Sequence, residues 1–220
     1  MNLVVISAGT GNPSSTRQLT DRLAQKSLDL LAQAGTPATA SVVELGPLAV
    51  DIARATVAGF PGETLQQAID KLAAADAIIA ATPIYKAGIS GLFKTFVDVL
   101  DNDLIVAKPV LLAATGGTAR HALVIDDQLR PLFAFMRAFT LPTSVYAAPE
   151  DWGSTELGTR IERAATELAV LARAGVEQQV AEQAWSGYQH QFAGNARRAE
   201  RTADDVDFDA PLMRLAAGGQ

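Results

Sequence analysis

The chain has 220 residues, 49% of them apolar, which suits a single α/β domain with a large buried core and leaves little room for a second full domain. Its net charge of −6 argues against a nucleic-acid-binding protein, because phosphate backbones select basic surfaces. With no cysteine, and with only His121 and His190, the sequence excludes disulfides, a cysteine nucleophile and a convincing metal site, so redox chemistry needs a bound cofactor.

The start of the chain carries no targeting signal that we can identify. It leads directly into a strand pattern, without the basic segment and cleavage pattern of a signal peptide. No apolar run approaches the ~18 residues of a membrane-spanning helix. The sequence therefore predicts a cytoplasmic protein that does not enter a membrane.

A strand, a glycine-containing loop and a helix open the chain. The apolar residues 3–6 predict a buried strand, and the helical pattern that follows ends near Gly35. Between them, Gly9 and Gly11 favour a tight turn, and Ser14 is a good N-cap. Backbone N–H groups, the positive end of the helix and several hydroxyls converge there, as a phosphate dianion requires. The candidate ligands are Ser7, Thr10, Ser14, Ser15, Thr16 and Arg17.

Two better-known glycine loops do not fit this stretch. The dinucleotide fingerprint needs a third glycine where Ser14 stands, and no Gly-Lys-Ser/Thr follows for a nucleotide triphosphate loop. A loop for a single terminal phosphate, as in flavin mononucleotide (FMN), remains. An ordinary capped turn without a ligand is the alternative.

The next segments alternate between strand and helix patterns. Residues 40–45 predict a short strand, 48–62 a surface loop with a short helix, and 76–81 a strand buried on both faces. A helix with apolar residues from Leu65 to Leu72 precedes the buried strand. This alternation predicts a parallel, doubly wound sheet, in which ligands lie outside the carboxyl ends of the strands.

The loops after two later strands are candidate binding walls. Residues 82–91 can lie along a flat ligand, and the alternative is a proline-stiffened loop with Tyr85 packed. The buried strand 110–114 ends in a glycine pair, which lets the main chain approach a ring system; a permissive turn is the alternative. The candidate residues are Thr82, Pro83, Ile84, Tyr85, Thr115, Gly116 and Gly117.

The rest of the domain is predicted to be mostly helical. A helix over 119–139 should kink or break at Pro131, residues 141–147 should form the fifth strand, and Ser154 should cap a long helix. His121 follows the third loop and is a candidate ligand contact; the alternative is a hydrogen-bonded structural histidine.

The final segment has a different character. We divide the chain into a domain of residues 1–175 and an extension of residues 176–220. Apolar residues recur at helical spacing in the extension and predict a subunit interface, with packing on the same subunit as the alternative. These residues are Val180, Ala184, Trp185, Tyr188 and Phe192. The polar run 197–207 indicates a draped or mobile tail.

Three segments carry a family resemblance. They are Ala-Thr-Pro-Ile-Tyr-Lys-Ala at 81–87 with Gly91, Lys94 and Asp98 after it, Ala-Thr-Gly-Gly at 114–117, and Leu-Arg-Pro at 129–131. Together with the first loop, they make residues 3–147 resemble the NADPH-dependent FMN reductases of flavodoxin-like fold. The resemblance is greatest to reductases that supply reduced flavin to two-component monooxygenases.

The resemblance implies a five-stranded parallel sheet of flavodoxin-like fold, with a helical extension after it. It also implies FMN as the flavin, NADPH or NADH as the hydride donor, a monooxygenase as partner, and a homodimer or homotetramer. Residues 14–16 would then hold the FMN phosphate, 82–85 would line the ribityl chain and isoalloxazine, and 115–117 would meet the polar edge of the flavin.

The chain departs from the family pattern at two places. Family members commonly have an arginine soon after the first glycine, where this chain has Gly11 and Asn12, and Arg17 is a possible replacement. Some partnered reductases carry an aromatic residue where Asp127 stands here, so the mode of flavin transfer is left open.

The implied chemistry needs no acid, base or nucleophile from the protein. Hydride transfer from nicotinamide to flavin requires rings stacked at roughly 3 to 3.5 Å, and the cofactors carry the reactive atoms. The sequence therefore favours an NAD(P)H-dependent FMN reductase that releases FMNH2. The alternatives are an enzyme that retains FMN and reduces quinones, azo dyes or metal oxyanions, a flavodoxin-like electron carrier, and a flavin-free interaction protein.

Overall fold

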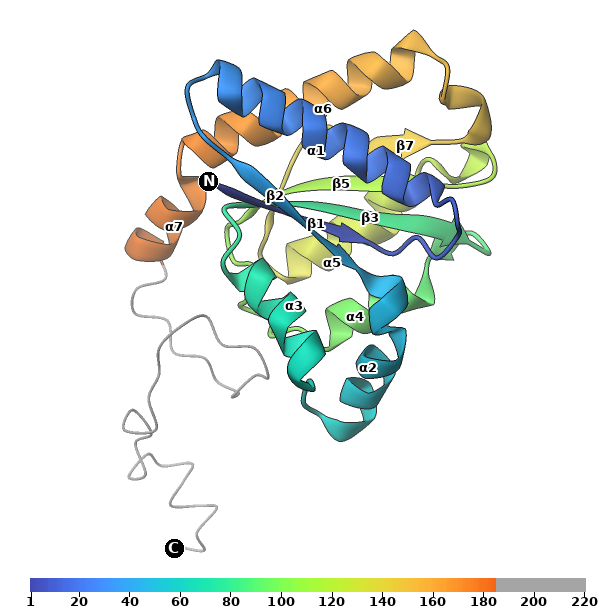
Figure 1. Ribbon diagram of the computed structural model, residues 1–220, viewed down its shortest axis with the longest axis vertical. Coiled ribbons are helices and arrows are strands. Elements are labelled where there is room, and N and C mark those ends of the chain that lie inside the picture. Colours follow the sequence, from blue (N-terminus) through green and yellow to red (C-terminus); the bar gives the residue numbers. More distant parts are fainter. Residues whose placement is uncertain (185–220) are drawn as a thin grey trace, which may run out of the picture.

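The computed structural model describes residues 1–184 as a twisted parallel sheet with helices on both faces (Figure 1). Its strands pair in the order β2-β1-β3-β5-β6, with β7 also paired to β5, and all of these pairs are parallel. The strands are β1 (Asn2–Ser7), β2 (Thr39–Glu44), β3 (Ala77–Tyr85), β5 (Pro109–Thr115), β6 (Phe139–Thr140) and β7 (Val145–Ala147). This arrangement confirms the predicted doubly wound, flavodoxin-like sheet, but with the short strand β4 (Gly88–Ile89) on β3 the sheet has seven strands rather than the predicted five.

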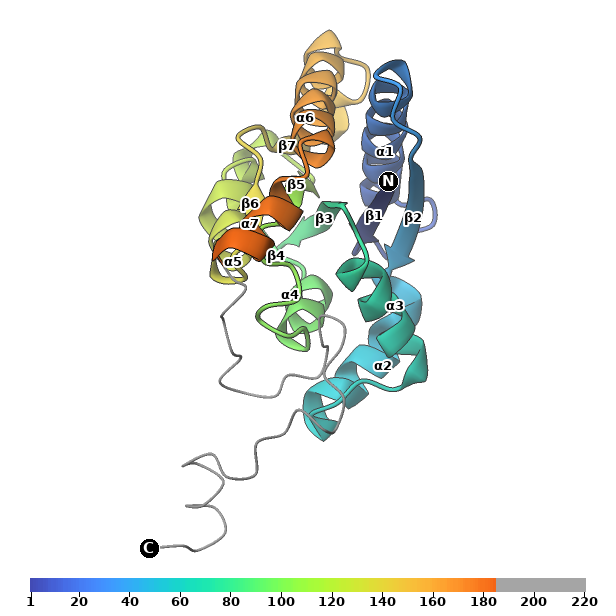
Figure 2. The ribbon, with the colours of Figure 1, turned by 90° about the vertical axis from the view of Figure 1, so that its left-hand side faces the viewer.

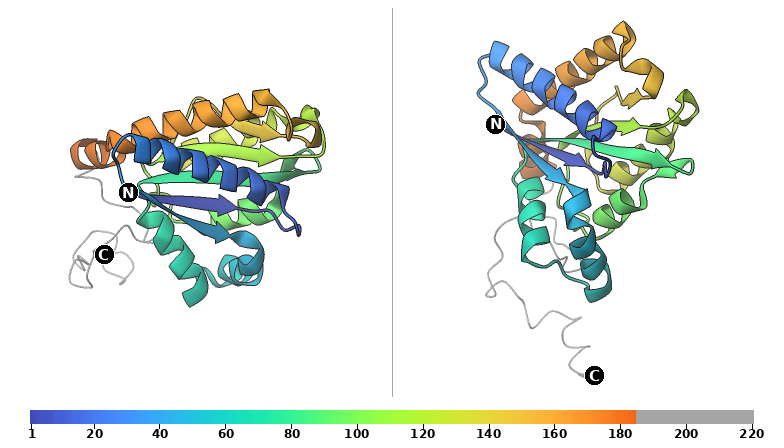
Figure 3. Two further views of the ribbon diagram at one scale, coloured as in Figure 1. Left: turned by 45° about the horizontal axis from the view of Figure 1, so that its top comes forward. Right: turned by 45° about the vertical axis from the view of Figure 1, so that its right-hand side comes forward.

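Two helical layers cover the sheet because its strands are apolar on both faces. On β1, Leu3 and Val5 belong to one core cluster, and Val4 and Ile6 belong to the other. Helices α1 (Ser15–Gln33) and α6 (Thr155–Arg173) lie side by side over the first cluster (Figure 3). Helices α2 (Leu45–Ala58), α3 (Glu63–Ala73), α4 (Gly91–Asp98) and α5 (Arg130–Phe135) cover the opposite face. Figure 2 shows the two layers from the end of the sheet.

The predicted helix starts follow the capping signals. Ser14 Oγ accepts the N–H of Arg17 at the start of α1, and Ser154 Oγ accepts the N–H of Leu157 at the start of α6. Gly35 follows α1 with a φ of 71°, a conformation that glycine adopts without strain. These local signals explain why the predicted ends agree with the structure to within a few residues.

The segment predicted as a surface loop with a short helix is mostly the helix α2, so that prediction was wrong. Pro47 lies in its first turn, where proline is tolerated, and Gly59 ends it with a φ of 80°. Ile52 and Ala55 are buried in the core cluster that α2 shares with α3 and α4, and this packing outweighs the weak helical pattern of the sequence.

Residues 82–91 were predicted to be a loop after the strand 76–81, and the structure corrects this prediction. Strand β3 continues to Tyr85, and the chain turns back into the short antiparallel strand β4 (Gly88–Ile89). Lys86 and Ala87 form the turn with positive φ values of 51° and 63°. The sequence has neither Asn nor Gly at these positions, so it lacks the usual hairpin signal.

The predicted continuous helix 119–139 is three short segments. A single 3₁₀ turn η1 (Ala119–His121) and a π-helical turn η2 (Ile125–Leu129) precede α5. Pro131 lies in the first turn of α5 and therefore marks a beginning rather than a kink. Of the predicted fifth strand 141–147, only residues 145–147 form a strand, β7, and the short strand β6 lies before the predicted range, at residues 139–140.

Helix α7 (Val176–Ala184) begins the extension and lies near the amino-terminal ends of the strands (Figure 1). Lys108, just before β5, is buried; its Nζ donates to the carbonyl of Ala75 at 2.6 Å and lies 3.5 Å from Glu177 Oε1 of α7. Of the proposed extension face, Trp185, Tyr188 and Phe192 lie outside the described residues. Within residues 1–184, none of the helices has the length and apolar character needed to cross a bilayer.

Candidate active site

The sheet order brings the three predicted loops together. Strands β1, β3 and β5 are adjacent and parallel, with Ser7 beside Ala81 and Pro83 beside Thr115, so their carboxyl ends form one edge. The order in which strands are added to the sheet reverses between β1 and β3: β2 lies on one side of β1, and β3 lies on the other. This is the switch point at which open α/β sheets bind ligands.

The first loop is built closely around Gly9. A Cβ on Gly9 would overlap Ser14 Oγ and would lie 2.9 Å from Thr16 Cβ. Because Ser14 Oγ also caps α1, it cannot move without losing that hydrogen bond. Thr10 and Ser15 are exposed at the same loop. The loop therefore presents hydroxyls and the start of α1 to solvent, as a phosphate site requires.

Two hydroxyls predicted as phosphate ligands are buried beneath this loop. Thr16 Oγ1 and Thr115 Oγ1 share a hydrogen bond of 2.7 Å, which joins the start of α1 to the end of β5. Ser7 is 1% exposed, and its Oγ has no hydrogen-bond partner among the residues that the structure describes. An unpaired buried hydroxyl is unfavourable, so a polar partner would stabilise the end of β1.

The charge of Arg17 is shared with two carboxylates. Its Nε lies 2.7 Å from Asp21 Oδ1 and its Nη1 lies 2.9 Å from Glu44 Oε1. The hydrogen bond to Asp21 is the main cause of a raised pKa for Arg17, and burial opposes it in part. Arg17 thus stands at the first loop as predicted, with its guanidinium already paired.

The second wall is held from beneath by Ser90. The Ser90 N–H donates to Thr82 Oγ1 at 3.1 Å, while Ser90 Oγ accepts the N–H of Phe93 and caps α4. Thr82, Pro83 and Ile84 are buried, whereas Tyr85 is 53% exposed. Of the four residues predicted there, only Tyr85 has an exposed side chain, and the other three form the base of the hairpin.

Gln128 holds the tip of the same hairpin. Its Oε1 accepts the N–H of Ile89 at 3.1 Å, and its Nε2 donates to the carbonyl of Ala87 at 3.4 Å. Because Gln128 belongs to the π-helical turn η2, the segment after β5 fixes the wall that follows β3.

The third loop is fixed from β7. The Gly116 N–H donates to the carbonyl of Ala147 at 3.2 Å, and the Tyr146 hydroxyl donates to the carbonyl of Thr118 at 2.6 Å. Gly117 is exposed, and a Cβ there would have no neighbour within 4 Å. His121 is half-buried in η1, with its N–H donating to the carbonyl of Thr118.

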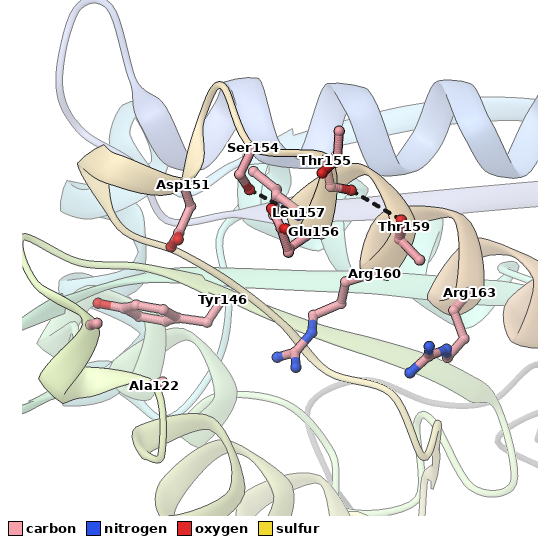
Figure 4. Close-up of a pocket in the computed structure, with 11 residues that line it drawn as sticks. Ala122, Tyr146, Asp151, Ser154, Thr155, Glu156, Leu157, Thr159, Arg160 and Arg163 are labelled. Atoms are coloured by element: carbon pink, nitrogen blue, oxygen red, sulfur yellow. Dashed lines mark hydrogen bonds between the residues drawn. The ribbon is translucent and has the colours of Figure 1, made fainter.

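Tyr146 also lines a cavity of about 510 Å³ between the segment 119–122 and the start of α6 (Figure 4). Arg160 and Arg163 extend from α6 toward this space, together with the shorter Thr159. Asp151 and Glu156 contribute opposite charge to the lining. The cavity therefore has mixed charge and lies beside the third loop rather than at the β1–β3 switch point.

Three residues that organise the site, Ser90, Gln128 and Tyr146, were not identified as site residues from the sequence. Ser90 was detectable, since Ser-Gly before an apolar helical pattern is a helix-start signal. Gln128 and Tyr146 act across 39 and 28 residues of sequence separation, so no local pattern identifies them.

The family model for "NADPH-dependent FMN reductase" matches residues 1–153 of this chain. This chain belongs to the NADPH-dependent FMN reductase family. It is therefore an oxidoreductase that uses FMN and a nicotinamide nucleotide, in agreement with the prediction from its sequence motifs.

Curated relatives include reductases named for either nucleotide. A Pseudomonas aeruginosa protein named FMN reductase (NADPH) is 39% identical over 176 residues, which cover 77% of this chain and 91% of the relative. A Pseudomonas putida protein named NADH-dependent FMN reductase SfnE is 38% identical over 175 residues, with the same coverage.

Solved structures agree with this family. A Corynebacterium diphtheriae oxidoreductase superposes with a TM-score of 0.77 at 42% identity, covering 79% of this chain and 97% of the other. The apo form of the NADH:FMN oxidoreductase EMOB gives a TM-score of 0.68 at 26% identity, covering 77% and 88%. An archaeal flavodoxin, at 12% identity and a TM-score of 0.51, shares the fold alone.

Proposed function

We propose that FMN binds across the carboxyl edge of β1, β3 and β5, with its phosphate at the first loop. The observation that carries this assignment is the Gly9–Ser14 packing, which leaves Thr10 and Ser15 exposed beside the start of a long helix. The further contacts are the predicted ones: Ser7, Ser14, Thr16 and Arg17 at the phosphate end, Thr82, Pro83, Ile84 and Tyr85 along the ring system, and Thr115, Gly116, Gly117 and His121 at its polar edge.

The residues present fit this role in shape and hydrogen-bonding capacity. Tyr85 supplies an exposed ring, Gly117 leaves open space beside the main chain, and the buried Ser7 hydroxyl has no partner within residues 1–184. FMN supplies the hydride-accepting chemistry when bound, and the chain binds and orients it. No protein acid or base is assigned to the reaction.

A flavin titration followed by an NAD(P)H assay tests this function. The absorbance band of FMN near 450 nm should shift when the flavin binds the protein. The protein should then oxidise NADPH, NADH or both in an FMN-dependent way. The family contains enzymes named for each nucleotide, so both must be assayed. Absence of oxidation with either nucleotide would contradict the proposal.

We further propose that FMNH2 leaves the enzyme and serves a partner monooxygenase. The support is the exposure of Ser15, Tyr85 and Gly117. A flavin bound to these residues would lie at the surface of the sheet edge, from which it can dissociate. Sequential kinetics with free FMN as substrate are expected. Ping-pong kinetics with FMN retained through gel filtration would instead favour a quinone, azo or metal reductase, and a stable blue semiquinone would favour an electron carrier.

We propose a cytoplasmic homodimer or homotetramer. Leu123, Phe135 and Phe139 are 76%, 67% and 46% exposed around η2 and α5, and large exposed apolar side chains of this kind are typical of subunit contacts. Sedimentation of the full chain should show a species of two or four subunits. The proposed boundary between residues 175 and 176 is tested by truncation there, which should shift that distribution if the extension contributes to the contact.

Replacing Ser15 and Thr16 together with alanine should weaken FMN binding. Hydrogen bonds to a charged group contribute about 1.5–3 kcal/mol each. Thr16→Ala also removes the bond to Thr115, so each single variant is compared with the double variant by flavin fluorescence titration. An unchanged FMN affinity in Ser15→Ala and in the double variant would show that the first loop does not hold the phosphate.

Gly117→Ala separates ligand contact from stability. A methyl group there meets no atom of the protein within 4 Å, and φ is not in the positive range, so the melting temperature of the flavin-free protein should not change. FMN affinity should fall about tenfold, the equivalent of ~1.4 kcal/mol, because the methyl group occupies space beside the flavin edge. A lower melting temperature with unchanged affinity would assign Gly117 to the turn instead.

A further inference from the structure

We propose that Tyr146 is a positioning residue of this reductase: its hydroxyl fixes the loop of residues 115–118 in the conformation that receives the flavin edge. The inference rests on the proposed FMN site and adds a residue outside it. Tyr146 comes from β7, 28 residues along the chain from the loop carbonyl that it binds.

The contact is specific at the level of single atoms. The Tyr146 hydroxyl donates to the carbonyl of Thr118 at 2.6 Å. A Cβ on Gly116 would overlap that hydroxyl and would lie 3.2 Å from Tyr146 Cζ. Gly116 therefore lacks a side chain at the place where the tyrosine hydroxyl lies, and the two residues are complementary.

The neighbouring contacts leave the loop little freedom. The Gly116 N–H donates to the carbonyl of Ala147, next to Tyr146, and Thr115 is tied to Thr16. Three bonds thus reach the loop from β7 and α1, while Gly117 remains exposed on its open side. A binding loop held in this way loses less conformational entropy when its ligand arrives.

The hydroxyl stays a donor at physiological pH. Tyr146 is 7% exposed, and burial raises its pKa above the ordinary tyrosine value, with smaller contributions from Asp151 and Glu150. A raised pKa means that the proton is retained to higher pH. The bond to Thr118 is therefore not switched off near neutrality.

Tyr146→Phe tests the inference because it keeps the ring and removes the hydroxyl. Hydrogen exchange of the 115–118 amides in the flavin-free protein should become faster. The KM for FMN should rise about five- to tenfold with little change in kcat, because one hydrogen bond contributes ~1 kcal/mol and the reacting atoms are not touched. Ser27→Ala is the matched control, since it removes another buried hydroxyl-to-carbonyl bond, from Ser27 to Leu23 within α1, and should leave both readouts unchanged.

A double variant adds a test of complementarity. Gly116→Ala alone should raise the KM for FMN more than Tyr146→Phe does, because the methyl group displaces the tyrosine. In Gly116→Ala with Tyr146→Phe, the hydroxyl that the methyl group would meet is gone, so the combined effect should be smaller than the product of the single effects.

The outcomes separate this inference from the proposed function. A wild-type protein that does not oxidise NADPH or NADH with FMN refutes the function, and the hydrogen-exchange result then still decides whether Tyr146 holds the loop. In an active enzyme, faster loop exchange together with a raised KM for FMN supports the inference. Unchanged exchange, or faster exchange with an unchanged KM, overturns it.

Discussion

Replacing Gly9 with alanine is expected to weaken FMN binding about 100-fold. The new methyl group would overlap Ser14 Oγ and press against Thr16 Cβ, so Ser14 must leave its capping position. Loss of the cap lowers the unfolding free energy by about 1 kcal/mol whether or not the ligand is bound. The lost hydrogen bonds to the phosphate contribute about 1.5–3 kcal/mol each to binding, and a loss of ~3 kcal/mol corresponds to about two powers of ten in affinity.

Gly46→Ala is the control for this change. Gly46 lies in the first turn of α2, close to the same loop, and a Cβ there would be 3.9 Å from Thr10 Cγ2, an ordinary contact. Flavin titration should separate the two variants clearly, while circular dichroism shows both to be folded. If both alanine variants bind FMN like the original protein, the first loop is only a capped turn.

Glu177→Leu is expected to lower the unfolding free energy by about 2–3 kcal/mol. Lys108 is 3% exposed in its side chain, and this change removes the carboxylate 3.5 Å from its ammonium group but keeps the hydrogen bond to the carbonyl of Ala75. Removing one member of a buried ion pair is costly because the other charge stays desolvated. For a chain of this size, the melting temperature should fall by about 5–10 °C.

A second substitution distinguishes charge from packing. Lys108→Met combined with Glu177→Leu should recover most of the lost stability, because an apolar pair of similar volume carries no desolvation penalty. Glu162→Gln is the surface control: its ion pair with Lys26 is 60% and 34% exposed and should contribute no more than about 1 kcal/mol. Turnover per folded molecule should not change, since Lys108 lies at the amino end of β5. An equal loss of stability in the rescue variant would refute the ion-pair explanation.

The elements that the sequence predicted well are those with strong local signals. Ser14 and Ser154 cap α1 and α6, and the apolar run 110–114 became a strand buried on both faces. Helix α2 was missed because its stability comes from burial of Ile52 and Ala55 rather than from its own pattern. The β3–β4 turn was missed because Lys86 and Ala87 adopt a conformation that their types disfavour.

The candidate site was predictable in its loops and less so in its supports. The alternation of strands and helices predicted a parallel sheet, and because the carboxyl ends of parallel strands meet at one edge, it placed the three loops there. Burial could not be read from residue type, so Ser7 and Thr16 were grouped with the exposed Ser15, and Thr82 with the exposed Tyr85, although Ser7, Thr16 and Thr82 are interior. Tyr146 and Gln128 support the loops through long-range pairs that depend on the complete fold.

The bond between Thr16 and Thr115 has a consequence for assembly of the protein. Its partners are 99 residues apart, so the first loop acquires this support only when α1 and β5 have come together. Such distant contacts form late, because the entropy of closing a long loop must first be overcome. A flavin that requires this arrangement binds the folded chain and not its early intermediates, and it shifts the folding equilibrium by mass action. The cellular supply of FMN would then influence how much of this chain is folded as well as how fast it turns over.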